Sequence, residues 1–77
     1  MNESETKIYK NILKHAGGAS RENLFMLLGQ VQDAFGYVPT AVIYDLAAST
    51  GVSQARIYGA LTSYGDFVVE QETEELK

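Results

Sequence analysis

The chain has 77 residues, of which 45% are hydrophobic and 21% are charged, with a net charge of −4 and no cysteine. A single small domain of this length buries only roughly 60% of the surface that its unfolded chain exposes, so its stability must come from well-packed apolar faces. The cysteine count excludes disulfides, thiol nucleophiles and thiolate-bound zinc or iron–sulfur centres within this chain. The polar first residues and the lack of an apolar run near the roughly 20 residues that cross a bilayer predict a cytoplasmic protein without membrane contact.

Two helices are predicted in the first half of the chain. Segment 4–16 has apolar residues at helical spacing, and the pair Gly17-Gly18 ends that helix. Ser20 is a suitable N-cap for the next helix, because its hydroxyl can accept from a free backbone N–H of the first turn. Gly36 ends this second helix. Its apolar positions are Leu24, Leu27, Leu28, Val31 and Phe35.

A short connector and a third helix follow. Tyr37-Val38-Pro39 is predicted to be extended, because the residue before a proline avoids the α region, and Pro39 or Thr40 begins the helix. Gly51 is suited to the left-handed conformation that ends it. The apolar side of this helix carries Val42, Ile43, Leu46 and Ala47.

The fourth helix is predicted to begin after Ser53, a second N-cap. Its inward face carries Ile57, Leu61 and Tyr64, with Val68 as a further candidate. Gly59 within it has two interpretations of equal weight, either close contact with another helix or a small residue tolerated on an exposed face. The later run Phe67-Val68-Val69 resembles a strand whose sheet is missing.

Four helical segments with connections of roughly two to four residues predict an all-α fold, a small bundle of four short helices with a helix-turn-helix-like corner. We expect residues 1–69 to form the single helical domain and residues 70–77 to be a flexible acidic tail. Charges within residues 8–69 cancel, so the acidity lies mainly in the tail. The tail charges are Glu70, Glu72, Glu74, Glu75 and Lys77.

Catalytic chemistry is not indicated. His15, the only histidine, lies at the end of a predicted helix, where an imidazole commonly interacts with the last carbonyls. No nucleophile elbow, zinc motif or phosphate-binding loop occurs, and the Gly17-Gly18 pair follows no strand. We therefore expect no catalytic residue, no metal site, no cofactor in this chain and no catalytic activity from this chain alone.

One pattern is typical of nucleic-acid binding. Segment 46–57 resembles a helix-turn-helix, with a small alanine for close approach, a glycine for the turn and two apolar residues for packing. Phosphate binding requires a basic surface, whereas residues 45–67 offer Arg56 against Asp45 and Asp66. We therefore do not expect nucleic acid as a partner; in this alternative, Gln54 and Arg56 would make the contacts.

A series of motifs between Leu24 and Phe67 carries a more specific pattern. In order, they are Phe35-Gly36-Tyr37-Val38-Pro39, Leu46-Ala47, Gly51-Val52-Ser53, Arg56-Ile57-Tyr58-Gly59, and then Thr62, Tyr64 and Phe67. With these motifs the segment resembles the N-terminal helical part of the complex I 24 kDa family. This family comprises the small iron–sulfur subunit of NADH:quinone oxidoreductase and its relatives in NAD(P)-linked hydrogenases and formate dehydrogenases.

The resemblance implies a place in such a complex. In the family these helices precede a thioredoxin-like domain whose cysteines hold a [2Fe–2S] cluster, and they pack against that domain and the flavin-containing NADH-binding subunit. This chain has no counterpart of those cysteines, and it reads Thr62-Ser63-Tyr64 where the family usually has Thr-Phe-Tyr. It is either a fragment of a longer subunit or a free-standing helical subunit.

We therefore expect a non-catalytic docking or assembly module of an NAD(P)H-linked flavin and iron–sulfur oxidoreductase. Its partner would be the flavin- and NAD(P)H-binding subunit or a thioredoxin-like [2Fe–2S] domain. The predicted partner-binding residues are Tyr37, Pro39, Arg56, Tyr58 and Phe67. The alternatives are a DNA-binding helix-turn-helix regulator and a self-associating helical protein without a redox role.

Overall fold

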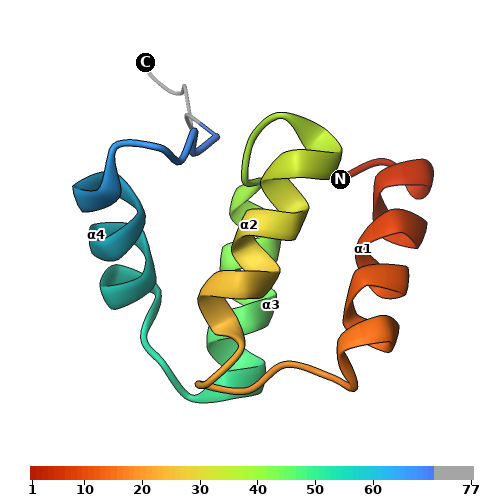
Figure 1. Ribbon diagram of the computed structural model, residues 1–77, viewed down its shortest axis with the longest axis horizontal. Coiled ribbons are helices and arrows are strands. Elements are labelled where there is room, and N and C mark those ends of the chain that lie inside the picture. Colours follow the sequence, from red (N-terminus) through yellow and green to blue (C-terminus); the bar gives the residue numbers. More distant parts are fainter. Residues whose placement is uncertain (71–77) are drawn as a thin grey trace.

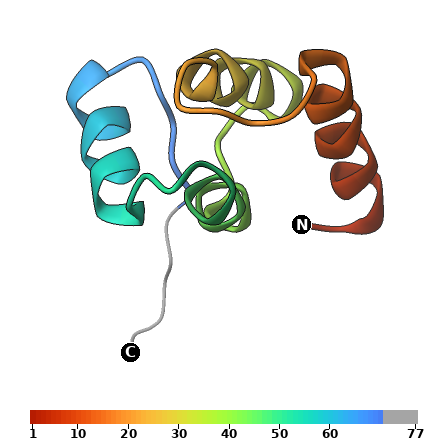
Figure 2. The same cartoon turned by 90° about the horizontal axis from the view of Figure 1, so that it is seen from below.

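The computed structural model describes residues 1–70 and confirms the predicted all-α fold. Its helices are α1 (Glu3–Ala16), α2 (Leu24–Phe35), α3 (Thr40–Thr50) and α4 (Gln54–Tyr64). Helices α2 and α3 lie one behind the other in the centre, with α1 on one side of them and α4 on the other (Figures 1 and 2). The helices whose backbones approach most closely are α1 with α2 and α3 with α4. The gap between α2 and α4 is therefore closed by side chains and by the segment that follows α4.

Most helix ends lie where the sequence predicts them. The first three helices end at Gly17, Gly36 and Gly51. The Ser53 hydroxyl accepts from the backbone N–H of Arg56 at 3.1 Å, so the predicted cap of α4 is confirmed.

The predicted cap of the second helix is wrong. Helix α2 begins at Leu24 with Asn23 as its N-cap residue, not with Ser20. Ser20 and Asn23 bond to each other instead, because the Asn23 side chain accepts from Ser20 N–H at 2.8 Å and the Ser20 hydroxyl accepts from Asn23 N–H at 3.3 Å. This reciprocal pair closes a non-helical turn over residues 21–23, so Ser20 caps that turn and not the first turn of α2.

The core lies between the central pair of helices and the two outer ones. Its buried members are Tyr9, Leu24, Leu27, Leu28, Val31, Val38, Val42, Ile43, Leu46, Ile57 and Leu61. These include the residues predicted to face inward on the second, third and fourth helices, apart from Tyr64, Val68 and the half-buried Phe35 and Ala47. Well-packed apolar faces thus hold this small chain together.

Two residues predicted on the inner face of the fourth helix are exposed. Tyr64 is 60% exposed and Val68 is 57% exposed. Gly65 ends α4 with a φ of +76°, a left-handed conformation that turns the chain back toward α2 and brings Phe67 onto the core. Phe67 therefore occupies the place predicted for Tyr64. Gly59 is also exposed, and a Cβ added there would meet nothing within 4 Å, which supports the second interpretation of this glycine.

The strand-like run after α4 pairs with the connector between α2 and α3. Val38 and Val69 form an isolated parallel bridge. Val38 N–H donates to the Val68 carbonyl at 2.7 Å, and Glu70 N–H donates to the Val38 carbonyl at 3.0 Å. The end of the described chain is thus attached to the fold as far as Glu70. The predicted division at residue 70 stays a prediction, because residues 71–77 lie outside the described part.

A buried tyrosine joins α1 to α3. The Tyr9 hydroxyl donates to the Asp45 carboxylate at 2.6 Å. Burial, the hydrogen bond to Asp45 and the negative charge of Asp45 together raise the pKa of Tyr9 above its ordinary value. Ionisation of Tyr9 is therefore less favourable in the folded state than in the unfolded chain.

This raised pKa predicts a loss of stability in alkali. Above a pH of about 10 the unfolded chain releases the Tyr9 proton while the folded chain keeps it, so the free energy of unfolding falls as the pH rises. Tyr9→Phe should lower stability by about 1 kcal/mol at neutral pH, through loss of the hydrogen bond, and should remove this part of the alkaline decline. Urea unfolding of both proteins between neutral pH and pH 11 would measure the difference. Parallel pH profiles for wild type and variant would contradict the prediction.

Candidate docking surface

The structure brings part of the predicted partner-binding set together. Tyr37 and Pro39 flank Val38 in the connector, and the Val38–Val69 bridge places this connector beside the segment that contains Phe67. Pro39 is buried, so it shapes the connector and exposes almost no side chain. Tyr37 is half-buried, with its hydroxyl 3.5 Å from Glu5 Oε2. Partial desolvation and the negative charges of Glu5 and Glu70 raise the pKa of Tyr37.

Two other members of the set lie on different sides of α4. Arg56 lines a groove between α2 and α4, whereas Tyr58 lines a groove between α3 and α4. Tyr58 is 44% exposed, so its side chain lies at the surface and not in the core. The five predicted residues therefore do not form one continuous patch. Partner binding by each of them stays a prediction.

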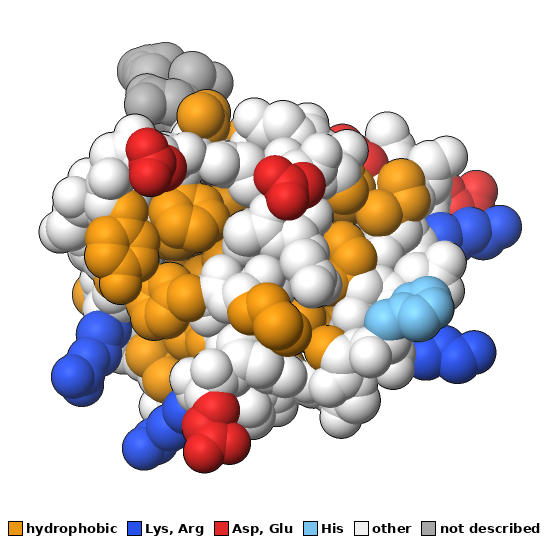
Figure 3. All heavy atoms as spheres, viewed as in Figure 1, with side chains coloured by type: hydrophobic (Ala, Val, Ile, Leu, Met, Phe, Trp, Pro, Cys, Tyr) orange, Lys and Arg blue, Asp and Glu red, His pale blue; other side chains and the backbone are white. Residues whose placement is uncertain are grey.

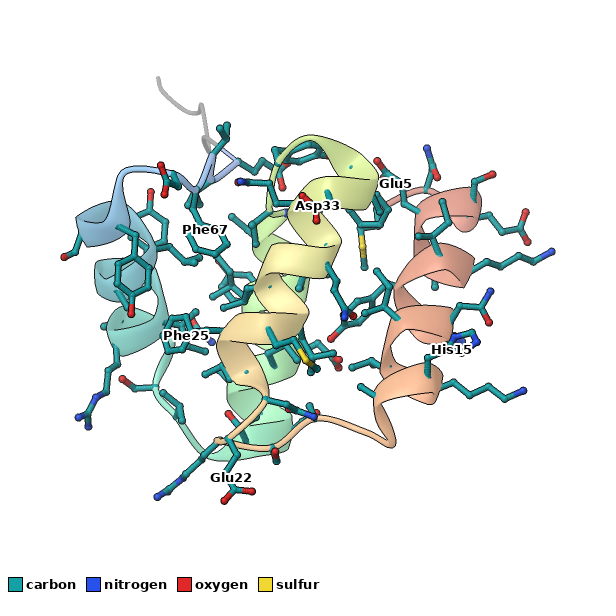
Figure 4. All side chains as sticks on the ribbon, viewed as in Figure 1. Glu5, His15, Glu22, Phe25, Asp33 and Phe67 are labelled. Carbon is teal, nitrogen blue, oxygen red and sulfur yellow. The ribbon has the colours of Figure 1, made fainter. Side chains whose placement is uncertain are left out.

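The groove between α2 and α4, here called the α2–α4 groove, is lined by residues that the sequence does not single out. Its main lining residues are Arg21, Phe25, Val52, Arg56, Ala60 and Tyr64. The Phe25 and Tyr64 rings meet edge to face with centroids 5.8 Å apart. The centroid of the Phe67 ring lies 6.2 Å from that of Tyr64. Figure 4 shows Phe25 and Phe67 between α2 and α4. An exposed phenylalanine on the outer side of a predicted helix is the sequence feature that could have revealed Phe25.

The groove between α3 and α4, here called the α3–α4 groove, has a different character. It is lined by Thr40, Ile43, Tyr44, Tyr58 and Glu70, among others. The Glu70 carboxylate accepts from Thr40 N–H at 2.9 Å and lies 3.3 Å from the Thr40 hydroxyl. A carboxylate thus satisfies one free N–H at the start of α3 and faces the positive end of its dipole.

Metal binding has no support in the described part of the chain. No group of three or more histidine, cysteine, aspartate or glutamate side chains within residues 1–70 is arranged to hold a metal ion. The His15 ring nitrogen Nδ1 lies 2.8 Å from the Asn11 carbonyl, near the end of α1. Over the same residues, no helix combines the length and the apolar character that crossing a membrane requires.

The corner between α3 and α4 has the predicted helix-turn-helix order, but nothing supports DNA binding there. Gln54 and Arg56 are exposed at the start of α4. Arg56 is the single basic residue between residues 45 and 67, which leaves no excess positive charge for a phosphate backbone.

Comparison with known protein families decides the relationship. Residues 9–75 match the family of thioredoxin-like [2Fe–2S] ferredoxins, which is the complex I 24 kDa family. The chain belongs to this family. The predicted resemblance is confirmed, and the family links the chain to NADH-linked oxidoreductases. No solved structure matches the chain.

The cofactor of the family does not fit the residues of this member. A [2Fe–2S] cluster of the thioredoxin-like type is held by cysteine thiolates, and none of the 77 residues is a cysteine. The 24 kDa-like chain therefore shares the family pattern without the ligands of the cluster.

Proposed function

We propose that this 24 kDa-like chain is a non-catalytic docking or assembly module of an NAD(P)H-linked flavin and iron–sulfur oxidoreductase. The observation that carries the proposal is family membership over residues 9–75 in a chain that has no cysteine. What such a chain retains is a packed helical bundle with an exposed surface. A protein with these properties can bind and position another subunit, while electron transfer takes place in that subunit.

The surface around α4 supports a docking role. Arg56 and Tyr58 are exposed, and Phe67 is half-buried beside the core. Aromatic residues and arginine are enriched at the centres of protein interfaces, where they provide much of the binding energy. The partner would be the flavin- and NAD(P)H-binding subunit or a thioredoxin-like [2Fe–2S] domain carried by another chain. We expect this docking to occur in the cytoplasm.

Affinity capture from the native cell extract tests the proposal. The wild-type chain should recover a flavin-containing or iron–sulfur oxidoreductase subunit. Tyr58→Ala and Phe67→Ala should each weaken recovery about tenfold or more, because truncating an interface anchor costs at least about 2 kcal/mol. Ile8→Ala is a matched control, since Ile8 is an exposed apolar residue on α1, on the other side of the central helices (Figure 1).

The outcomes separate the function from the residues. Capture of no redox protein by the wild type would reject the proposed function. Equal capture by the wild type and by both folded α4-side variants would reject Tyr58 and Phe67 as contacts, while the function would stand.

A further inference from the structure

We propose that the α2–α4 groove binds a partner segment in which an apolar side chain is flanked by carboxylates. The inference rests on the proposed function, because it names one part of the docking surface around α4 and the partner chemistry that this part would recognise. The groove has a volume of about 630 Å³, which is enough for one or two side chains of a bound peptide. Figure 3 shows hydrophobic side chains gathered on this part of the surface, with cationic side chains at its left and lower edges and acidic side chains above it and beside the lower cation.

The apolar part of the groove is an exposed aromatic cluster. Phe25 is 37% exposed and Tyr64 is 60% exposed, although their rings contact each other. Phe67 extends the cluster onto the core, with which it packs. An aromatic cluster that is anchored on one side and open on the other can bury an additional apolar side chain without rearranging the fold. The open side of this cluster therefore favours a partner that inserts an apolar side chain there.

The charged residues that line the groove are both arginines. Arg21 and Arg56 both line it, and none of its lining residues in the described chain is acidic. The Arg21 side chain reaches across to the end of α3, where its Nε donates to the Thr50 carbonyl at 3.4 Å. The N-cap residue of α4, Ser53, also lines the groove, so the positive end of that helix dipole lies at the same place. Glu22, the nearest acid in sequence, lies at the lower end of the molecule and is not part of the groove lining (Figure 4).

These charges determine the partner chemistry. Positive groups on the rim of an apolar groove attract carboxylates on the partner, steer its approach and disfavour basic segments. The α3–α4 groove offers the contrast, because Glu70 is part of its lining.

Peptide binding to the full chain tests the proposal. The probe is a fluorescein-labelled peptide with the sequence Glu-Glu-Leu-Phe-Glu-Glu, and binding is followed by fluorescence anisotropy and by amide chemical shifts. The two comparison peptides are Lys-Lys-Leu-Phe-Lys-Lys and Glu-Glu-Ala-Ala-Glu-Glu. We expect the first peptide to bind about tenfold more tightly than either comparison peptide, with shifts concentrated at Phe25, Ala60 and Tyr64.

Two substitutions check the two parts of the groove. Arg56→Glu should weaken binding of the first peptide about five- to tenfold, and this loss should shrink at high salt. Tyr64→Ala should weaken it by a similar factor at any salt concentration. Lys14→Glu is the matched control, because it makes the same charge change at an exposed position near the end of α1. It should leave the affinity unchanged.

Several results would overturn the proposal. One is equal affinity for the acidic and basic peptides. Others are no binding of the first peptide, or amide chemical shift changes that lie outside the groove. Self-association of the wild type that Tyr64→Ala abolishes would assign the groove to a second copy and would also overturn it. If the peptide binds but the wild-type chain captures no redox protein, the proposed function is rejected and the groove stands. If Arg56→Glu and Tyr64→Ala leave the capture of a redox protein unchanged, the groove is rejected and the function stands.

Discussion

Leu28→Ala and Ile57→Ala should each lower the free energy of unfolding by about 2 to 5 kcal/mol. Both side chains are fully buried, one on the central helix α2 and the other on the outer helix α4. Each truncation removes apolar contacts and leaves a cavity that the surrounding helices fill only in part. Because a domain of this size has a total stability of only about 5 to 10 kcal/mol, either change should shift the urea midpoint strongly.

Met26→Ala is the matched control for these core substitutions. Met26 lies on α2 but is 51% exposed, so its truncation should change stability by less than about 0.5 kcal/mol. A loss below 1 kcal/mol for both Leu28→Ala and Ile57→Ala would show that these helix faces are not the core.

Gln32→Ala should release the segment that follows α4. The Gln32 amide bonds this segment at two points, since its Nε2 donates to the Asp66 carbonyl at 2.8 Å and its Oε1 accepts from Val68 N–H. Loss of both hydrogen bonds should cost about 1 to 3 kcal/mol. It should also weaken the Val38–Val69 bridge, because the bridge is a single pair that requires the segment to be held in place.

Amide hydrogen exchange measures this local effect. The amides of Val38 and Glu70, which donate across the bridge, should exchange faster in Gln32→Ala than in the wild type. Amides in the middle of α1 should exchange at the wild-type rate once the change in global stability is taken into account. Gln30→Ala is the control, because Gln30 lies on the same helix and is exposed. Unchanged exchange at Val38 and Glu70 would show that Gln32 does not hold the segment.

The helices of this protein are determined by local sequence. Apolar residues at helical spacing produce faces such as that of Leu27, Leu28 and Val31, which are buried as predicted. Most helix ends are equally local, because a glycine that follows an apolar stripe can adopt the left-handed conformation and a serine before one can accept from the first turn. The family was also recognisable from the sequence, through motifs such as Phe35-Gly36-Tyr37-Val38-Pro39.

Contacts between distant segments were decided only by the tertiary structure. Helical spacing assigns Tyr64 to the inner face of α4, but the turn at Gly65 brings Phe67 onto the core and leaves Tyr64 exposed beside Phe25. Periodicity describes one helix at a time, so it cannot say which of two aromatic residues near a helix end will be covered by a returning chain. Phe25 and Arg21 are likewise ordinary surface residues in the sequence. They become one side of an apolar, positively charged groove only because α4 lies opposite α2, and that placement depends on packing between segments some 30 to 40 positions apart.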